Sequence, residues 1–251
     1  MHPDRRRRRP LSALSLALLA LPALLAAPAS PSPAERAIAD ARRAIAANPA
    51  QPDGYNALGM ALARRARETA DGRFYEQAAE AAKKSLDLAP DNLEARKLEV
   101  WLLLGRHEFT AALNLARALI RRASGDPALY GFIADACAEL GKYQEAEEAA
   151  QWMLDLGRSS VPGLTRAAYL REVFGDIEGS AELMTSAYDM LAPSLVEDRA
   201  WVLTHLAHLR LLTGQLDAAG KLLDEALRQF PGYHYALLHL ARLRGIQGRR
   251  D

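Results

Sequence analysis

Small side chains recur at 34-residue intervals along the middle of this chain. Ala78, Ala112, Ala146 and Ser180 are separated by equal steps of 34 residues, and Ala219 continues the series after a longer step. Each opens a triad of small or apolar residues whose spacing places them on one helical face. Two-helix repeats of about this length stack into solenoids, because one helix pair cannot bury its apolar face alone. The period therefore predicts an all-α chain of stacked antiparallel helix pairs.

The amino-acid composition favours helical structure, and the net charge limits the classes of partner. Half of the 251 residues are hydrophobic, only 6% are aromatic, and Ala, Leu and Arg dominate, which favours helix over strand. The formal net charge of +1 conceals five arginines and one aspartate in residues 1–29, so the remainder is slightly acidic. A slightly acidic body predicts no nucleic-acid partner. The single cysteine, Cys137, excludes an internal disulfide and is expected to be a buried packing residue.

The first 29 residues have the three-part layout of a secretory signal peptide. An unbroken basic run at 5–9 is followed by an apolar run at 11–27 and by Ala27-Pro28-Ala29, which fits a small-x-small cleavage site. We expect cleavage of residues 1–29, a spacer at 30–33, and an exported protein in the periplasm or outside the cell. After cleavage we expect no stable membrane span. The alternative is an uncleaved signal that anchors the chain in the inner membrane.

Glycines and prolines divide each period into two helices. Gly141, Gly175, Gly214 and Gly248 follow the first helix of successive pairs, where glycine accepts the left-handed conformation of a helix end. Prolines close several of the second helices, because the residue before a proline is turned away from helix.

Two stretches carry a family resemblance. The segments GKYQEAEEAAQWML, from Gly141, and GQLDAAGKLLDEALRQFPGY, from Gly214, resemble the tetratricopeptide repeat (TPR) family. The resemblance covers roughly residues 34–251 and implies a right-handed superhelical solenoid of antiparallel helix pairs. The expected units are a half repeat at 34–51, full repeats at 52–92, 93–126, 127–160, 161–194 and 200–233, and a terminal helix at 234–248.

Three departures from the period stand out. The first full repeat is seven residues longer than the period, which predicts a lengthened first helix and a longer turn near Asp71. In the second repeat Gly105 arrives two residues early. Residues 195–199 are an insertion before the fifth repeat.

The resemblance further implies that the first helix of each pair lines the concave inner surface. Interior positions in the second half of the chain are rich in aromatic and imidazole side chains, and such residues are favoured in binding hot spots. The alternative for Trp201 and Tyr235 is simple packing between neighbouring helices. The predicted partner-binding residues are Trp101, Arg166, Tyr169, Trp201, His205, His208, Tyr235, His239 and Arg242.

No motif for catalysis, phosphate binding or metal binding appears in the sequence. His205, His208 and His239 could share an ion only with inward rotamers, so we expect no metal and no cofactor. The function predicted is a non-catalytic scaffold or adaptor that binds another protein or a peptide in the concave groove, in the cell envelope or outside. The alternative is a binder of a non-protein ligand, a glycan or lipid, in the aromatic second half of the groove. The sequence leaves the oligomeric state open.

Overall fold

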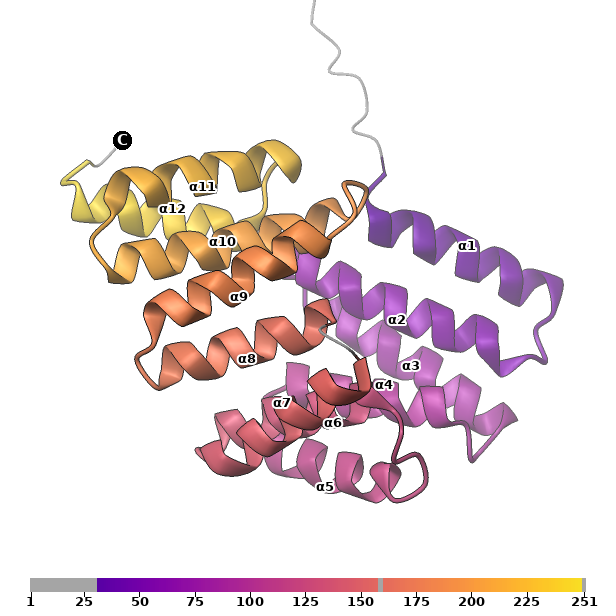
Figure 1. The fold of residues 1–251 in the computed structure, drawn as a ribbon. Coiled ribbons are helices and arrows are strands. Elements are labelled where there is room, and N and C mark those ends of the chain that lie inside the picture. The colour runs from indigo at the N-terminus through magenta and orange to yellow at the C-terminus, as the bar shows by residue number, and fades with distance from the viewer. Residues whose placement is uncertain (1–30, 158–159, 250–251) are drawn as a thin grey trace, which may run out of the picture. The chain divides into compact units, whose positions relative to one another are not determined.

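The computed structural model describes residues 31–157 and 160–249, so the predicted signal peptide lies outside the described residues. The described residues contain twelve α-helices and no strand (Figure 1). The helices are α1 Pro33–Ala47, α2 Pro52–Thr69, α3 Arg73–Leu88, α4 Leu93–Gly105, α5 Phe109–Ile120, α6 Pro127–Glu139, α7 Tyr143–Gly157, α8 Val161–Val173, α9 Ile177–Met190, α10 Val196–Leu212, α11 Leu216–Gln229 and α12 His234–Ile246.

Short polar side chains start several of these helices by accepting hydrogen bonds from otherwise unpaired backbone N–H groups. At α1, Ser32 and Glu35 form a reciprocal capping box. Asn92 caps α4 through the N–H of Ala95, at 2.9 Å. Ser32 and Pro33, which the sequence placed in the spacer, therefore belong to the start of α1.

The ends of most even-numbered helices depend on single left-handed residues. Gly141, Gly175, Gly214 and Gly248 have φ values between 71° and 85°, as their positions in the sequence predict. After α4 this conformation falls on His107, with φ of 61°, instead of on the early Gly105. Gly105 serves packing, because a Cβ there would lie 3.1 Å from Cζ of Tyr75.

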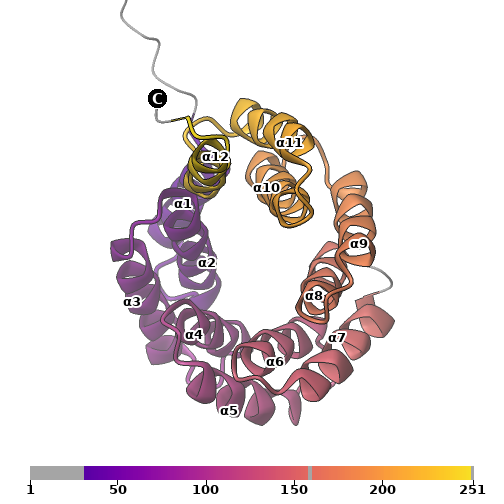
Figure 2. The same ribbon diagram turned by 90° about the vertical axis from the view of Figure 1, so that its left-hand side faces the viewer.

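The helix pairs follow one another around a central axis. In Figure 2, α4, α6, α8 and α10 face the interior, whereas α3, α5, α7, α9 and α11 lie outside. Consecutive helices pack side by side, and α2, α4 and α6 are each also in contact with the next even-numbered helix. The described residues thus form the predicted superhelical solenoid of antiparallel helix pairs.

The recurring small residues form the contacts between paired helices. Ala78, Ala112, Ala146, Ser180 and Ala219 all have no exposed surface. A larger side chain at these positions would push the helices apart, because protein interiors are close-packed. The sequence period is therefore the period of this tight contact.

Two helices of the inner layer are longer than the rest. α2 has 18 residues and α10 has 17, whereas α4, α6 and α8 have 13 each. The extension of α2 follows from the long first repeat. Of the residues expected as an insertion at 195–199, Leu195 is the N-cap residue of α10 and the other four form its first turn.

Candidate functional site

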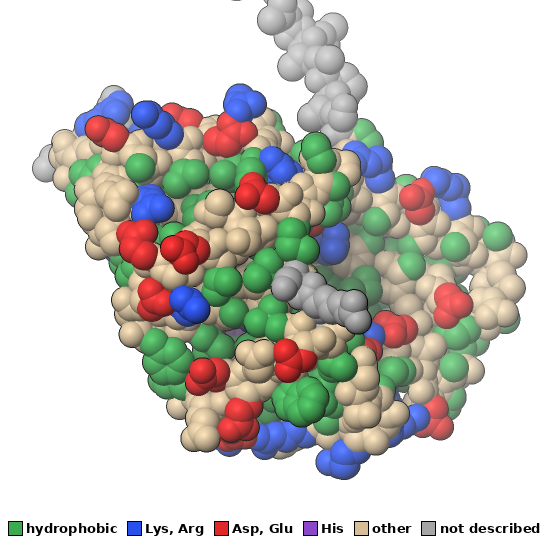
Figure 3. Space-filling model, viewed as in Figure 1, with side chains coloured by type: hydrophobic (Ala, Val, Ile, Leu, Met, Phe, Trp, Pro, Cys, Tyr) green, Lys and Arg blue, Asp and Glu red, His purple; other side chains and the backbone are tan. Residues whose placement is uncertain are grey.

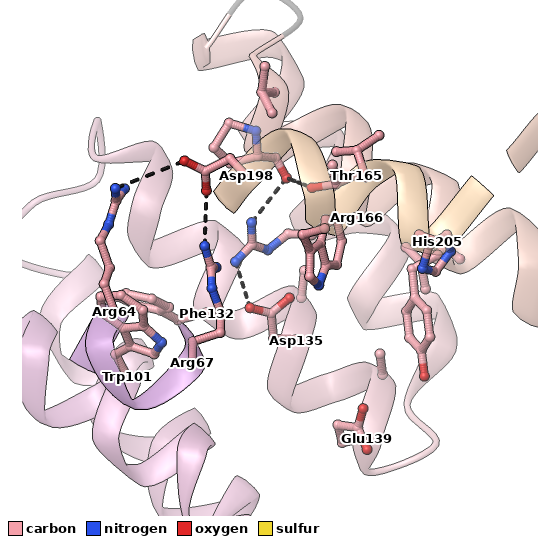
Figure 4. A pocket seen from close by; sticks show the side chains of 18 of the residues that line it. Arg64, Arg67, Trp101, Phe132, Asp135, Glu139, Thr165, Arg166, Asp198 and His205 are labelled. Atoms are coloured by element: carbon pink, nitrogen blue, oxygen red, sulfur yellow. Dashed lines mark hydrogen bonds and ion pairs between the residues drawn. The ribbon is translucent and has the colours of Figure 1, made fainter. Parts of the chain in front are cut away.

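The interior of the solenoid contains a cavity of about 530 Å³. Its walls come from α2, α4, α6, α8 and α10, and Figure 4 shows their side chains converging on it. Lining residues recur at spacings of three or four positions, as in Asp198, Trp201 and His205 of α10, and such residues share one helical face. The apolar and aromatic part of the lining includes Met60, Trp101, Phe132, Tyr169, Trp201 and His205.

Part of this apolar lining is open to solvent. Tyr169 is 39% exposed and Met60 is 42% exposed, although both lie in the interior of the solenoid. Covering such side chains is worth roughly 25 cal/mol per Å² of apolar surface removed from water. The cavity therefore offers favourable burial to an occupant.

Five of the six charged side chains that line the cavity lie beside a side chain of opposite charge. Arg166 donates to Asp135 at 2.6 Å and to the carbonyl oxygen of Gly131 at 3.1 Å. A Cβ at Gly131 would lie 3.1 Å from the guanidinium carbon of Arg166, so the glycine permits this close approach. On the opposite wall Arg67 donates to Asp198 at 2.9 Å, and Arg64 lies 4.0 Å from the same carboxylate (Figure 4). These pairs nearly cancel the net charge of the lining.

A histidine cluster adjoins the cavity behind His205. The two carboxylate oxygens of Glu172 lie 2.8 Å from Nε2 of His205 and 2.9 Å from Nε2 of His208. Burial raises the pKa of Glu172, but the hydrogen bond with His208, the close contact with His205 and the charge of the two histidines outweigh it and bring the pKa to about 2.

His239 completes this cluster from α12. Its ring centroid lies 5.3 Å from that of His208. Burial, followed by the neighbouring charges of His208 and Arg242, lowers the pKa of His239 from 6.5 to about 4. In the part of the chain that the structure describes, no group of three or more His, Cys, Asp or Glu side chains is arranged to hold a metal ion.

The structure brings only some of the nine predicted binding residues to the cavity. Five of them line the cavity: Trp101, Arg166, Tyr169, Trp201 and His205. The other four do not line it. His208 and His239 belong to the adjoining cluster, Arg242 is exposed on α12, and the ring of Tyr235 packs on His234 with centroids 4.0 Å apart.

Sequence reasoning missed the polar residues that join the two sides of the cavity. Arg67 and Asp198 line it from α2 and α10 but were not among the predicted residues. Both lie in the segments that depart from the 34-residue period. The two departures from the period were the only sequence signal for these residues. The period gives no reason to expect that the long first repeat and the insertion at 195–199 lie close together.

The helix arrangement and the interior cavity define an all-α solenoid of repeated helix pairs. Among solved structures, it is similar to TTC0263, a thermophilic TPR protein of Thermus thermophilus, with 18% sequence identity, a TM-score of 0.65, and coverage of 76% of this chain and 98% of that chain. It is also similar to the APC/C hetero-tetramer Cut9–Hcn1, with 15% identity, a TM-score of 0.67, and coverage of 86% of this chain and 40% of that chain.

A third similar structure is human IFIT1 with m7Gppp-AAAA, at 19% identity and a TM-score of 0.61, covering 79% of this chain and 48% of that chain. No protein-family model matches the sequence, and no curated protein sequence matches it. At these identities the likeness establishes the fold. The chain has the TPR-like fold that its sequence motifs indicate.

Proposed function

We propose that this chain is a non-catalytic interaction scaffold that holds a segment of another protein in its interior cavity. The observation that carries the proposal is the partly exposed aromatic and apolar lining, contributed by five separate helices. Aromatic side chains supply contact area at low entropic cost, and Arg166 beside Asp135 adds polar groups that can pair with a peptide backbone.

Charge distribution argues against a phosphate-rich partner. The cavity arginines Arg67 and Arg166 are already paired with carboxylates, so few cations are free to neutralise phosphates. On the face seen in Figure 3, basic and acidic side chains are interspersed. We therefore propose a protein or peptide partner for this chain, although the similar structure of IFIT1 was solved with m7Gppp-AAAA.

We further propose that the chain acts after export, in the periplasm or outside the cell. The support is the basic run, apolar run and small-residue site in residues 1–29. No helix within the described residues has the length and apolar character of a membrane span. Amino-terminal sequencing of the protein isolated from its native host tests this. A mature chain beginning at Ser30 is expected, and retention of the apolar run would support an inner-membrane anchor instead.

Selection from a random peptide library displayed on phage tests the binding proposal. Peptides selected on the intact protein are expected to lose at least about tenfold in affinity with Tyr169→Ala or Met60→Ala, measured by fluorescence anisotropy. Trp152→Ala is the control, because Trp152 is 56% exposed and is not part of the cavity lining.

Equal affinities for the cavity variants and for the intact protein would contradict the proposed site. Failure to select any peptide, together with binding to a glycan array or to lipid vesicles that Tyr169→Ala abolishes, would favour the non-protein ligand. Circular dichroism of each variant checks that helix content is unchanged.

A further inference from the structure

The two lengthened helices of the inner layer meet each other in space. α2 extends beyond the usual length at its C-terminal end, and α10 gains a turn at its N-terminal end. Arg67 lies in the last turn of α2, whereas Glu197 and Asp198 lie in the first turn of α10. Two irregularities of the repeat, 130 residues apart in sequence, thus contribute opposite charges to one contact.

The contact is a multiple hydrogen-bonded ion pair. Nε of Arg67 donates to Oε1 of Glu197 at 3.1 Å, and Nη2 donates to Oε2 of the same carboxylate. The same Nη2 also donates to Asp198 at 2.9 Å. A two-point arginine–carboxylate pair has directional specificity that a simple surface pair lacks.

Burial distinguishes this contact from the surface pairs of the molecule. The side chain of Glu197 is 7% exposed, and its Oε1 also accepts a hydrogen bond from the fully buried Tyr233, at 2.8 Å. The charges also suit their helix ends, because a cation at a C-terminus and anions at an N-terminus complement the helix dipoles. We call the set of Arg67, Glu197, Asp198 and Tyr233 the junction.

The junction stands beside the cavity and joins two of its walls. Met60, Arg64 and Arg67 line one wall from α2, and Asp198, Trp201 and His205 line another from α10. Stacking of consecutive pairs connects these helices only through all the intervening repeats. The junction connects them directly.

We propose that the junction closes the superhelix on itself and thereby assembles the interior cavity as a composite binding site. Arg67 and Glu197 are positioning residues in this scheme, since they set the separation of the two walls. The inference rests on the proposed function for its binding consequence, but the closure itself is measurable without any partner.

The separation is measured with spin labels on the outer helices. Lys84→Cys on α3 and Asp224→Cys on α11 place labels at exposed positions, in a chain that also carries Cys137→Ala. Pulsed electron–electron double resonance is expected to give one narrow distribution of label-to-label distances for the labelled protein whose junction residues are unchanged. Arg67→Met and Glu197→Gln are expected to broaden the distribution and shift it to longer distances, with helix content retained.

Matched variants separate closure from general stability. Arg117→Met removes an ion pair to Glu145 between neighbouring repeats, and it is expected to leave the distribution unchanged. Arg67→Lys keeps the charge but loses the two-point geometry, so it is expected to give an intermediate distribution and provides the readout if Arg67→Met does not fold.

Two results would overturn the proposal. An unchanged distance distribution in Arg67→Lys and Glu197→Gln would show that the junction does not set the closure. If the site needs both walls, the junction variants should lose at least about tenfold in affinity for a phage-selected peptide. A changed distance distribution with unaltered peptide affinity would show that the site does not need both walls. If no peptide binds even the intact protein, the proposed function fails while the distance measurement still decides the closure.

Discussion

Two glycine-to-alanine substitutions provide a direct test of how close approach fixes this solenoid. Gly59 of α2 and Gly220 of α11 both lie within helices, where alanine is favoured over glycine by about 1 kcal/mol. A Cβ at Gly220 would meet its nearest neighbour, Cδ2 of Leu243, at an ordinary 3.5 Å. A Cβ at Gly59 would lie 2.2 Å from Cδ2 of Leu98 and 3.3 Å from the carbonyl oxygen of Ala78.

The two substitutions should therefore differ in their effect on stability. Gly220→Ala should stabilise the protein by about 1 kcal/mol, the helix-propensity gain alone. Gly59→Ala has the same gain in helix propensity, but its Cβ would displace the side chain of Leu98, which is 1% exposed and surrounded by packed atoms. Overpacking of this kind costs about 1–3 kcal/mol, so the net effect runs from near zero to about 2 kcal/mol of destabilisation. The expected difference between the variants is about 1–3 kcal/mol.

Urea unfolding followed by far-ultraviolet circular dichroism measures this difference. Repeat arrays do not always unfold in one step, so native-state hydrogen exchange of the α2 and α11 amides should accompany it. In thermal unfolding, 1 kcal/mol corresponds to roughly 2–4 °C for a domain of this size. If Gly59→Ala proved as stable as Gly220→Ala, the small residue would not be required by the α2–α4 contact, and the reasoning would be refuted.

Further predictions concern titration and thiol reactivity. The pKa of His239 is about 4 in the folded chain against an ordinary 6.5, so the unfolded chain takes up the proton first. The free energy of unfolding should therefore fall as pH drops from about 6.5 to about 4. His239→Gln should remove about 1–2 kcal/mol of that loss, a value reduced for the partial exposure of the side chain. Urea unfolding of both proteins at about pH 7 and about pH 4.5 measures the difference. An identical pH dependence in both proteins would contradict the assigned pKa. Burial also raises the pKa of the Cys137 thiol, so a disulfide reagent at about pH 7 should react no faster than the chain unfolds, and fast reaction of the native protein would refute this.

Local signals explain why most of the fold was predictable. The even-numbered helices end at a glycine or another residue in the left-handed conformation, and several helices begin at residues that cap an N-terminus. His107 marks the limit of that reasoning. It takes the left-handed conformation after α4, while the nearby Gly105 is needed for close contact with Tyr75. The sequence shows a glycine, but it does not show whether the fold uses its tolerance of the left-handed conformation or its lack of a Cβ.

The candidate site was only partly accessible to the same reasoning. Trp201 and His205 line the cavity because the period places them on the inner face of a helix. Tyr235 occupies a related position on α12, yet it does not line the cavity and packs on His234 instead. Helical phase determines which side of a helix a residue occupies, but the course of the superhelix determines whether that side faces the cavity.

The stack of helix pairs can be predicted from the residues alone, because Ala78, Ala112 and Ala146, which have no exposed surface, recur once in each helix pair. These contacts lie within and between neighbouring repeats, so a local pattern records them. The contact of the long α2 with the long α10 through Arg67 and Glu197 becomes visible only in the folded chain. That meeting depends on small rotations between repeats that accumulate along the whole array, and no single repeat encodes their sum.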